Sequence, residues 1–284
     1  MKQPNPSTAE ILGPGDNFHI RAEDGKARCG VISTAHGQVT TPAFMPIATQ
    51  GSVKGLSPRE LQALGTQIVL ANCYHLALRP GVEVIQSLGG LHRFMGWHGP
   101  ILTDSGGYQV YSLAPLRKVT DEGVRFRSHI DGREVWFTPE SVVSLQNALG
   151  VDIGMVLDEC PPAAAPRKTV EEATRRSLAW ARRSRVLLKD FDTPVIFGIV
   201  QGGVFADLRR WHAHELVALD FAGYAVGGLS VGEERGVTQE MAAVTVEELP
   251  RTRPRYLMGV GYPEDLIRFV AMGYDLFDCV LPPR

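Results

Sequence analysis

The strongest constraint on the fold is a series of eight short apolar segments separated by polar stretches of helical character. Near-continuous hydrophobic strands are typical of a parallel sheet, which is buried on both faces. Eight such strands alternating with helices over roughly 250 residues favour a (β/α)8 TIM barrel, an α/β fold, over an open doubly wound sheet. The segments are Ala43–Ala48, Gln67–Ala71, Pro100–Leu102, Ile153–Leu157, Val195–Val200, Tyr224–Val226, Tyr256–Val260 and Leu276–Leu281.

Capping residues and prolines mark where several helices begin. Ser57-Pro-Arg-Glu60 and Thr169-Val-Glu-Glu172 have the spacing of capping boxes, and the second predicts a helix that reaches about Lys189. Proline in the first turn predicts further helices from Thr138-Pro139 and from Tyr262-Pro263. After the fifth apolar segment, the sequence predicts a helix from residues that recur at helical spacing: Phe205, Leu208, His212, Leu216 and Leu219.

Two regions depart from the alternation of strand and helix. Between residues 18 and 41, Asp24-Gly25 and His36-Gly37 separate short alternating runs, which predicts N-terminal antiparallel β-hairpins. Residues 124–137 hold two more runs around Asp131-Gly132, which predicts a β-hairpin inserted after the third barrel strand.

The two ends of the chain also carry expectations. Residues 1–16 are rich in Pro, Gly and Ser and are expected to form a flexible leader, so that residues 17–284 form a single barrel domain. The eighth apolar segment ends at Leu281-Pro-Pro-Arg284, and no helix follows to cover its outer face. We therefore expect an incomplete barrel that lacks its last helix, with low stability or aggregation from exposed apolar surface.

Composition limits the class of protein. With 284 residues, 44% of them hydrophobic and 21% charged, the chain has an ordinary globular composition. It contains no apolar run of membrane-spanning length and no signal-peptide core, which predicts a cytoplasmic protein without membrane attachment. The net charge of −2 requires any nucleic-acid partner to bind at a local basic patch. The four cysteines, which lack metal-like spacing and are expected to be reduced thiols, are Cys29, Cys73, Cys160 and Cys279.

Polar residues follow the predicted strands where a barrel places its active site, at the carboxyl ends. Asp104 and Asp158 end the third and fourth strands, and Asp278 lies in the eighth. Carboxylates that converge in this way suit reaction at a sugar carbon, where one acts as nucleophile and another moves protons. Gln201-Gly-Gly203 and Gly227-Gly228 suit hydrogen bonding to the edge of a planar heterocycle, with an aromatic ring such as Tyr108 beside it.

Each of these features has an ordinary structural alternative. A single aspartate after a strand is more often a helix cap or a loop charge, although the apolar residues after Asp278 make a cap hard to assign there. Gly227-Gly228 fits a kink that closes the barrel equally well. The histidines His75, His212 and His214 are expected to be packing or surface residues.

Six motifs, in order and on the expected strands, make the chain resemble the bacterial tRNA-guanine transglycosylase (queuine tRNA-ribosyltransferase) family. The resemblance runs from about Phe18 to the last residue. The motifs are Thr103-Asp-Ser-Gly-Gly-Tyr-Gln109, Asp158-Glu-Cys160, Gln201-Gly-Gly203, Val226-Gly-Gly-Leu-Ser-Val-Gly-Glu233, Tyr256-Leu-Met-Gly-Val-Gly261 and Phe277-Asp-Cys-Val-Leu-Pro282.

The resemblance implies a TIM-barrel transferase of queuosine biosynthesis. Such an enzyme exchanges the wobble guanine in the anticodon loop of the Tyr, His, Asn and Asp tRNAs for a 7-deazaguanine base. By motif position, Asp278 is the nucleophile that attacks ribose C1′ and forms a covalent adduct, and Asp104 is the general acid and base. A double displacement of this kind retains the configuration at the ribose carbon.

The resemblance also implies a base-binding site. Asp158 is expected at the ring edge, Ser105 is expected to bind the substrate, and Tyr108 and Met258 are expected to sandwich the base. Cys160 and Val231 match the bacterial pattern, which favours 7-aminomethyl-7-deazaguanine (preQ1) over queuine. The other expected contacts are Gln201, the Gly228 and Leu229 backbones, and Glu233, which is expected to support a flip of the Leu229–Ser230 peptide toward the ligand's ammonium.

Some family features differ here or lie outside the sequence. Pro283 stands where the family usually has Thr, and Cys73 stands where Thr usually follows Asn72. The family's structural zinc, held by three cysteines and a histidine, is expected to have its ligands beyond Arg284, together with a basic RNA-binding segment and much of the homodimer surface. No cofactor and no metal ligand are therefore assigned in this chain.

Three other interpretations stay open. A retaining glycoside hydrolase shares the paired carboxylates, but the glycine-lined base pocket argues against it. A non-catalytic RNA-binding subunit of the same family is disfavoured because Asp104 and Asp278 are both present. The third is an inactive fragment whose site residues are intact.

Overall fold

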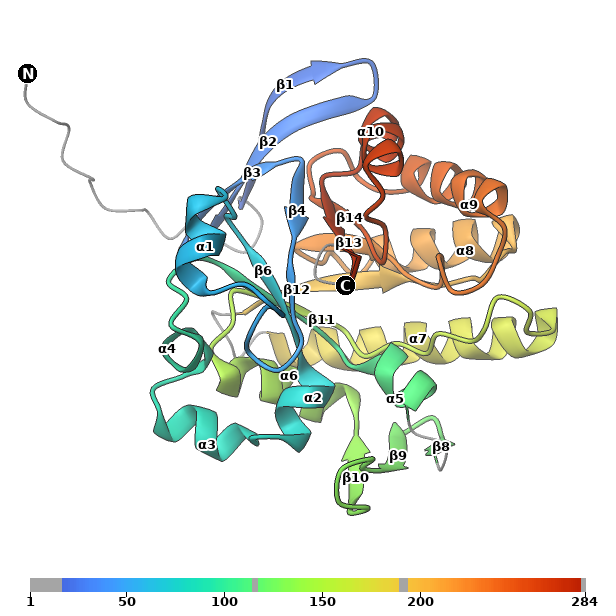
Figure 1. The fold of residues 1–284 in the computed structure, drawn as a ribbon. Coiled ribbons are helices and arrows are strands. Elements are labelled where there is room, and N and C mark those ends of the chain that lie inside the picture. The colour runs from blue at the N-terminus through green and yellow to red at the C-terminus, as the bar shows by residue number, and fades with distance from the viewer. Residues whose placement is uncertain (1–16, 114–116, 189–193, 282–284) are drawn as a thin grey trace, which may run out of the picture.

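The computed structural model describes residues 17–113, 117–188 and 194–281 (Figure 1). The predicted leader, residues 1–16, and the last residues, 282–284, lie outside the described residues. In the part that the structure describes, no helix is long and apolar enough to cross a membrane.

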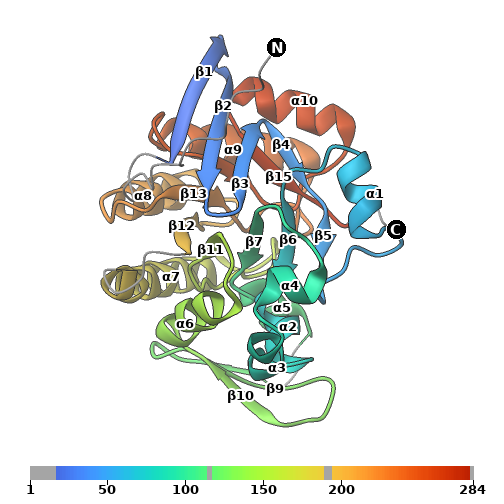
Figure 2. The same ribbon diagram turned by 90° about the vertical axis from the view of Figure 1, so that its left-hand side faces the viewer.

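The predicted barrel is confirmed. Its strands are all parallel and follow the order of the chain around the ring. In Figure 2 the helices lie outside this ring. The strands are β4 (Ala43–Met45), β5 (Ile47–Ala48), β6 (Val69–Asn72), β7 (Ile101–Asp104), β11 (Ile153–Met155), β12 (Val195–Val200), β13 (Gly223–Val226), β14 (Arg255–Leu257) and β15 (Leu276–Asp278).

The first predicted strand is divided at Pro46, and this division closes the barrel. β4 pairs with β15, whereas β5 pairs with β6 on the other side of the ring. Pro46 has no N–H to donate to a neighbouring strand, but its carbonyl accepts from the amide of Leu70 at 3.0 Å. The segment that contains β4 and β5 therefore lies between β15 and β6 and closes the ring.

Three predicted strands extend past the carboxyl ends that the structure shows, and the first of them, β11, ends at Met155 instead of Leu157. β14 ends at Leu257 and β15 ends at Asp278, although apolar residues continue past both points. Gly259, with φ of +76°, takes the chain out of the sheet after β14. Beyond these points Val260 is buried at the mouth of the barrel, whereas Val280 is exposed.

Three antiparallel strands precede the barrel, as the glycine turns predict. They are β1 (Phe18–Asp24), β2 (Ala27–Thr34) and β3 (Gly37–Thr41). This sheet is fixed to the amino ends of the barrel strands by Arg28, which is buried and donates from Nε to Asp275, just before β15, at 2.8 Å. Because the sheet covers this end, the opposite end of the barrel is left for a ligand.

The predicted helices at Ser57, Thr138 and Tyr262 are confirmed, and the first two begin with capping boxes. The predicted box at Thr169 is wrong. That helix begins at Arg167 after Pro166, whose fixed φ already sets the chain direction, so Thr169 lies inside the first turn. The helices are α1 (Pro58–Ala63), α2 (Cys73–Leu78), α3 (Val82–Ser87), α4 (Leu91–Met95), α5 (Gly107–Leu113), α6 (Pro139–Leu149), α7 (Arg167–Leu187), α8 (Ala206–Val217), α9 (Arg235–Glu247) and α10 (Pro263–Met272).

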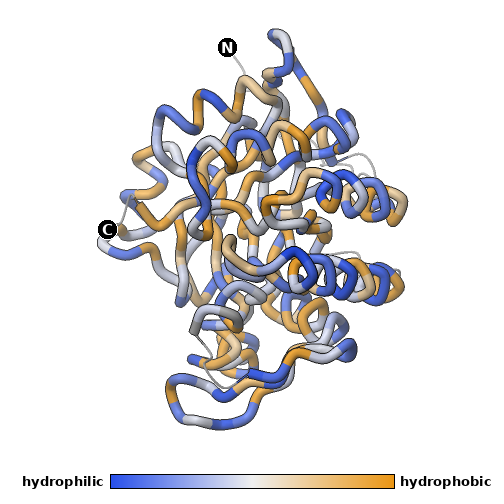
Figure 3. The backbone as a smooth tube through the Cα atoms, turned by 90° about the vertical axis from the view of Figure 1, so that its right-hand side faces the viewer, coloured by the Kyte–Doolittle hydropathy of each residue, from blue (hydrophilic) through white to orange (hydrophobic). Residues whose placement is uncertain are grey.

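The predicted insertion is confirmed as β9 (Val124–Arg127) and β10 (Glu134–Phe137), and it gains a third strand, β8 (Arg117–Val119). Phe126 and Phe137 on one face of this small sheet are buried. In Figure 3 the apolar stretches follow the barrel strands, while the outer helices carry many hydrophilic residues. The core therefore lies in the barrel and between the barrel and its helices.

Candidate functional site

A cavity of about 620 Å³ opens at the carboxyl ends of the barrel strands. It gathers nine of the twelve site residues expected from the sequence: Asp104, Tyr108, Asp158, Cys160, Gln201, Gly228, Val231, Met258 and Asp278. Ser105, Leu229 and Glu233 do not line this cavity, and Glu233 instead lines a second cavity described below. The three aspartates that the sequence placed on separate strands therefore share one space.

Asp278 lies at the end of β15 and is held by two donors. The Tyr256 hydroxyl donates to its Oδ1 at 2.6 Å, and the Gly259 amide donates to the same oxygen at 2.8 Å. Burial raises the pKa of Asp278, while these two hydrogen bonds act in the opposite direction. The second oxygen, Oδ2, accepts neither of these bonds, which leaves it available to a substrate.

Asp104 ends β7, and its surroundings favour the protonated form. Burial raises the pKa of Asp104 to about 8, and the nearby charge of Asp278 adds to this shift. The Asn72 side chain and the Cys73 amide, at the start of α2, donate to the carboxylate but do not offset burial. Near neutral pH, Asp104 therefore carries a proton that it can donate, and it accepts one readily after losing it.

Asp158, after β11, connects several of the expected residues. Ser105 donates to its Oδ1 at 3.0 Å, and Gln201 donates from Nε2 to its Oδ2 at 2.7 Å. Burial raises the pKa of Asp158 to about 6, although these hydrogen bonds oppose the shift. Ser105 thus acts on Asp158 rather than lining the cavity, and Asp158 offers carboxylate oxygens to donors on a planar ligand.

Gly228, which lines the cavity, and Gly107, beside Asp158, both lie tightly against other parts of the site. Gly228 has φ of +65°, and a Cβ there would lie 2.3 Å from Oε1 of Gln201. A Cβ at Gly107 would lie 2.4 Å from the carbonyl oxygen of Asp158. No side chain fits at either position, which explains the glycine pairs of the motifs better than a kink that merely closes the barrel.

Tyr108 and Met258 both line the cavity, on α5 and after β14. The Tyr108 side chain is half exposed, and Met258 is partly buried. Cys160 is buried, and burial raises the pKa of its thiol to about 12, so it stays a neutral wall residue. The sandwich of a ring between Tyr108 and Met258 remains a prediction.

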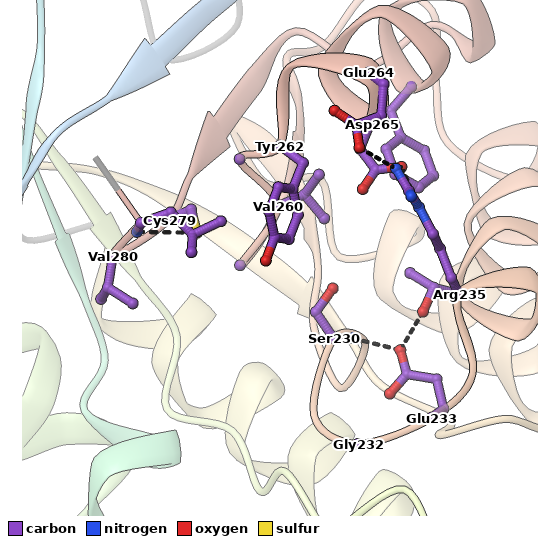
Figure 4. A pocket seen from close by; sticks show the side chains of 15 residues that line it. Ser230, Gly232, Glu233, Arg235, Val260, Tyr262, Glu264, Asp265, Cys279 and Val280 are labelled. Atoms are coloured by element: carbon purple, nitrogen blue, oxygen red, sulfur yellow. Dashed lines mark hydrogen bonds and ion pairs between the residues drawn. The ribbon is translucent and has the colours of Figure 1, made fainter. Parts of the chain in front are cut away.

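A second cavity, of about 630 Å³, adjoins the first and shares Ser230, Gly259, Cys279 and Val280 with it. Figure 4 shows the Glu233 carboxylate turned toward Ser230 at this boundary. Glu233 accepts the backbone N–H of both Ser230 and Val231. In a trans peptide the C=O points opposite to the N–H, so the Leu229 carbonyl is directed away from Glu233.

Sequence reasoning missed several residues that support the site. The sequence predicts Tyr256 as part of an apolar strand, yet its hydroxyl donates to Asp278. His212 is fully buried, as a packing residue would be, but its Nδ1 also accepts the backbone N–H of Gln201 at 2.8 Å. His75 lines the cavity. A buried polar residue within an apolar helical stripe was the available signal for His212.

The described residues do not fit the family's zinc site. The four cysteines lie apart, on or beside β2, α2, β11 and β15. His36, His92 and Asp152 are close together, but the two imidazole rings are stacked, with centroids 3.6 Å apart and planes at 19°. One ion cannot lie near both ring planes in that arrangement, and each ring instead binds a different Asp152 oxygen, at 2.9 and 3.1 Å.

A closed parallel barrel with buried carboxylates at its carboxyl ends defines a (β/α)8-barrel protein with an enzyme-like cavity. Comparison with known proteins agrees. The model of one protein family, Queuine tRNA-ribosyltransferase, matches residues 23–284. The chain belongs to this family.

Curated members of the family are similar over most of the chain. The queuine tRNA-ribosyltransferase of Pelotomaculum thermopropionicum is 55% identical over 262 residues, which cover 92% of this chain and 70% of that protein. That of Desulforudis audaxviator is 53% identical over 269 residues, covering 94% of this chain and 72% of that protein. That of Thermus thermophilus is 51% identical over 267 residues, with coverage of 94% and 69%.

Proposed function

We propose that this protein is a tRNA-guanine transglycosylase, a pentosyltransferase that replaces a guanine in tRNA during queuosine biosynthesis. The observation that carries the proposal is the convergence of Asp104, Asp158 and Asp278 in one glycine-walled cavity. Membership in the queuine tRNA-ribosyltransferase family supports it. A tRNA substrate places the reaction in the cytoplasm.

In the first half of the reaction, a carboxylate oxygen of Asp278 attacks ribose C1′ of the wobble guanosine. A bond forms between C1′ and this oxygen, and the bond from C1′ to N9 of guanine breaks. The electron pair goes to the departing base, which takes the proton of Asp104. The hydrogen bonds from Tyr256 and Gly259 favour the ionised form of Asp278 and oppose the effect of its burial, whereas burial favours the protonated form of Asp104 that the departing base requires.

In the second half, the incoming base gives its N9 proton to the Asp104 carboxylate and attacks C1′ from the opposite side to Asp278. The C1′–oxygen bond breaks and Asp278 leaves as a carboxylate. Two displacements at the same carbon retain its configuration. The target nucleotide must leave the base stack to reach the cavity, which a single-stranded anticodon loop allows at low cost.

For the incoming base we propose 7-aminomethyl-7-deazaguanine. Asp158 and Gln201 present an acceptor and an amide at the edge where a guanine-like ring would lie. The Leu229 carbonyl, directed away from Glu233, is free to accept from the aminomethyl group. Partial burial opposes ionisation of Glu233, but donors from Thr238, Ser230 and Val231 lower its pKa, so the carboxylate holds this peptide orientation.

The finer assignments of partner follow the family resemblance. We propose the anticodon loops of the Tyr, His, Asn and Asp tRNAs as substrates and a homodimer as the assembly. The structural zinc of the family has no fitting ligands among residues 17–113, 117–188 and 194–281, and the reaction above uses the protein's carboxyl groups.

Incorporation of labelled guanine into a tRNA-Tyr transcript tests the function. We expect label in the RNA, and none in a transcript whose wobble guanine is replaced by adenine. Label in neither RNA, from protein with a cooperative unfolding transition, would contradict the proposal. Release of an aryl group from an aryl glycoside would instead support a glycoside hydrolase.

Glu233→Gln tests the choice of base. The amide can donate to the Leu229 carbonyl, so the peptide orientation is no longer fixed, and we expect the preference for the aminomethyl base over guanine to fall about tenfold. The measurement is the ratio of kcat/KM for the two bases. Glu264→Gln is the matched control, because Glu264 lies on the rim of the second cavity and pairs with Arg235. An unchanged ratio in Glu233→Gln would count against this role.

A further inference from the structure

We infer that Arg209 and His212, one turn apart on α8, are positioning residues that set the hydrogen-bonding edge of the base pocket. The inference rests on the proposed function and extends it to two residues outside the cavity lining. Both side chains are fully buried, and neither was expected to act in the site.

Arg209 binds backbone carbonyls from two different loops at the carboxyl end of the barrel. Its Nε donates to Gly203 O, after β12, at 2.7 Å. Its Nη2 donates to Gly227 O at 3.1 Å and to Gly228 O at 3.2 Å, both after β13. Burial lowers the pKa of Arg209 to about 10, so the guanidinium stays charged at neutral pH. One buried cation therefore joins the loops that follow two neighbouring strands.

The contacts from Arg209 to the Gly227 and Gly228 carbonyls also set the direction of the backbone N–H groups that follow them. In a trans peptide the C=O and the next residue's N–H point in opposite directions. With the Gly227 and Gly228 carbonyls held on Arg209, the N–H groups of Gly228 and Leu229 are directed away from the guanidinium. Gly228 lies between Arg209 and the cavity, which it lines. Arg209 thus orients the backbone donors that are expected to read the base.

His212 fixes the neighbouring part of the same edge. Burial lowers its pKa to about 3, so the ring is neutral and its Nδ1 accepts the Gln201 amide. The Gln201 side chain extends from this anchored backbone to Asp158, and its Oε1 is buried without a hydrogen-bond partner among the described residues. A Cβ at Gly228 would lie 2.3 Å from this Oε1, so the Gln201 side chain and the Gly228 backbone pack directly against each other.

The alternative is that Arg209 and His212 only stabilise the barrel. A purely structural role predicts lower stability with unchanged base affinity in the folded fraction. A positioning role predicts a selective loss of affinity for the free base, because the donors and the Gln201 amide are displaced. The hydrogen bonds described above for the Asp104 and Asp278 carboxyl groups go to neither Arg209 nor His212, so kcat at a saturating concentration of base should persist.

Arg209→Met removes the guanidinium while keeping an unbranched side chain of similar length. We expect the KM for guanine to rise about 10- to 100-fold, with kcat at saturating guanine within about threefold and the KM for tRNA nearly unchanged. Arg210→Met is the matched control, because Arg210 is the next residue of α8 and is exposed. A fall in kcat with an unchanged guanine KM, or an equal effect in the control, would overturn the inference.

Two substitutions of His212 keep the test decisive if Arg209→Met does not fold. His212→Asn places an acceptor near the position of Nδ1, whereas His212→Phe removes it. We expect a raised guanine KM in the Phe variant and recovery toward the wild-type value in the Asn variant. Equal values in the two variants would contradict a positioning role.

The wild-type chain separates this inference from the proposed function. Wild-type protein that incorporates no guanine would count against the function. Wild-type protein that exchanges guanine, together with folded Arg209 and His212 variants whose guanine KM matches it, would count against the inference alone.

Discussion

Asp278→Asn is expected to abolish base exchange, reducing incorporation of guanine by at least about 10⁴-fold. The amide keeps the size of the side chain and still accepts from Tyr256 and Gly259, but it lacks a nucleophilic carboxylate oxygen. The measurement is label incorporated per enzyme, with a denaturing gel to detect the covalent RNA adduct. Both the label and the slowly migrating adduct should disappear.

A matched variant separates the loss of a nucleophile from the loss of a charge near the mouth. Asp265→Asn removes a carboxylate in the second cavity, where it pairs with Arg235 at 2.7 Å. That variant should retain exchange and form the adduct. Adduct formation by Asp278→Asn would show that another group attacks the ribose.

Asp104→Asn is expected to slow formation of the adduct by about 10²- to 10⁴-fold, because the departing guanine no longer receives a proton. Burial places the pKa of Asp104 at about 8, above the ordinary value for aspartate. The group is therefore protonated below that pH and loses its proton as the pH rises through it. In wild-type protein, single-turnover adduct formation without free base should fall about tenfold per pH unit above pH 8.

The same pH series identifies the group that titrates. The Asp104→Asn variant has no ionisable group at this position. Its rate of adduct formation should be lower than that of the wild type and should not decline further above pH 8. An alkaline decline of equal slope in wild type and variant would assign the titration elsewhere. At low pH the wild-type rate should also fall, because Asp278 must be ionised to attack and its pKa is raised by burial.

Much of the fold was readable because a parallel barrel buries both faces of its strands. All eight apolar segments became barrel strands, and the aspartates at their ends met in one cavity. The rule that active sites lie at the carboxyl ends needs only the strand order, which the sequence contains. The division of the first strand at Pro46 could not be predicted from the sequence, because it depends on the pairing of β4 with β15 and of β5 with β6.

The supporting contacts could not be predicted because they join residues far apart in sequence. The contacts from Tyr256 to Asp278 and from Arg209 to Gly228 depend on how separate strands and loops pack, and no local spacing encodes them. Ser105 is expected to bind the substrate, which stays a prediction, and its hydrogen bond to Asp158 was not predicted. Motifs located the site, and tertiary packing determined how each side chain is used within it.

The division of the first strand has a consequence for folding. β4 aligns Met45 with Asp278, so the ring closes only when residues near the two ends of the described chain meet. Contacts between such distant residues cost the most loop entropy and form slowly. The proposed nucleophile lies on the strand at this seam. The pairing of β4 with β15 therefore both completes the ring and fixes the strand that carries Asp278, so the placement of the proposed nucleophile depends on closure of the barrel.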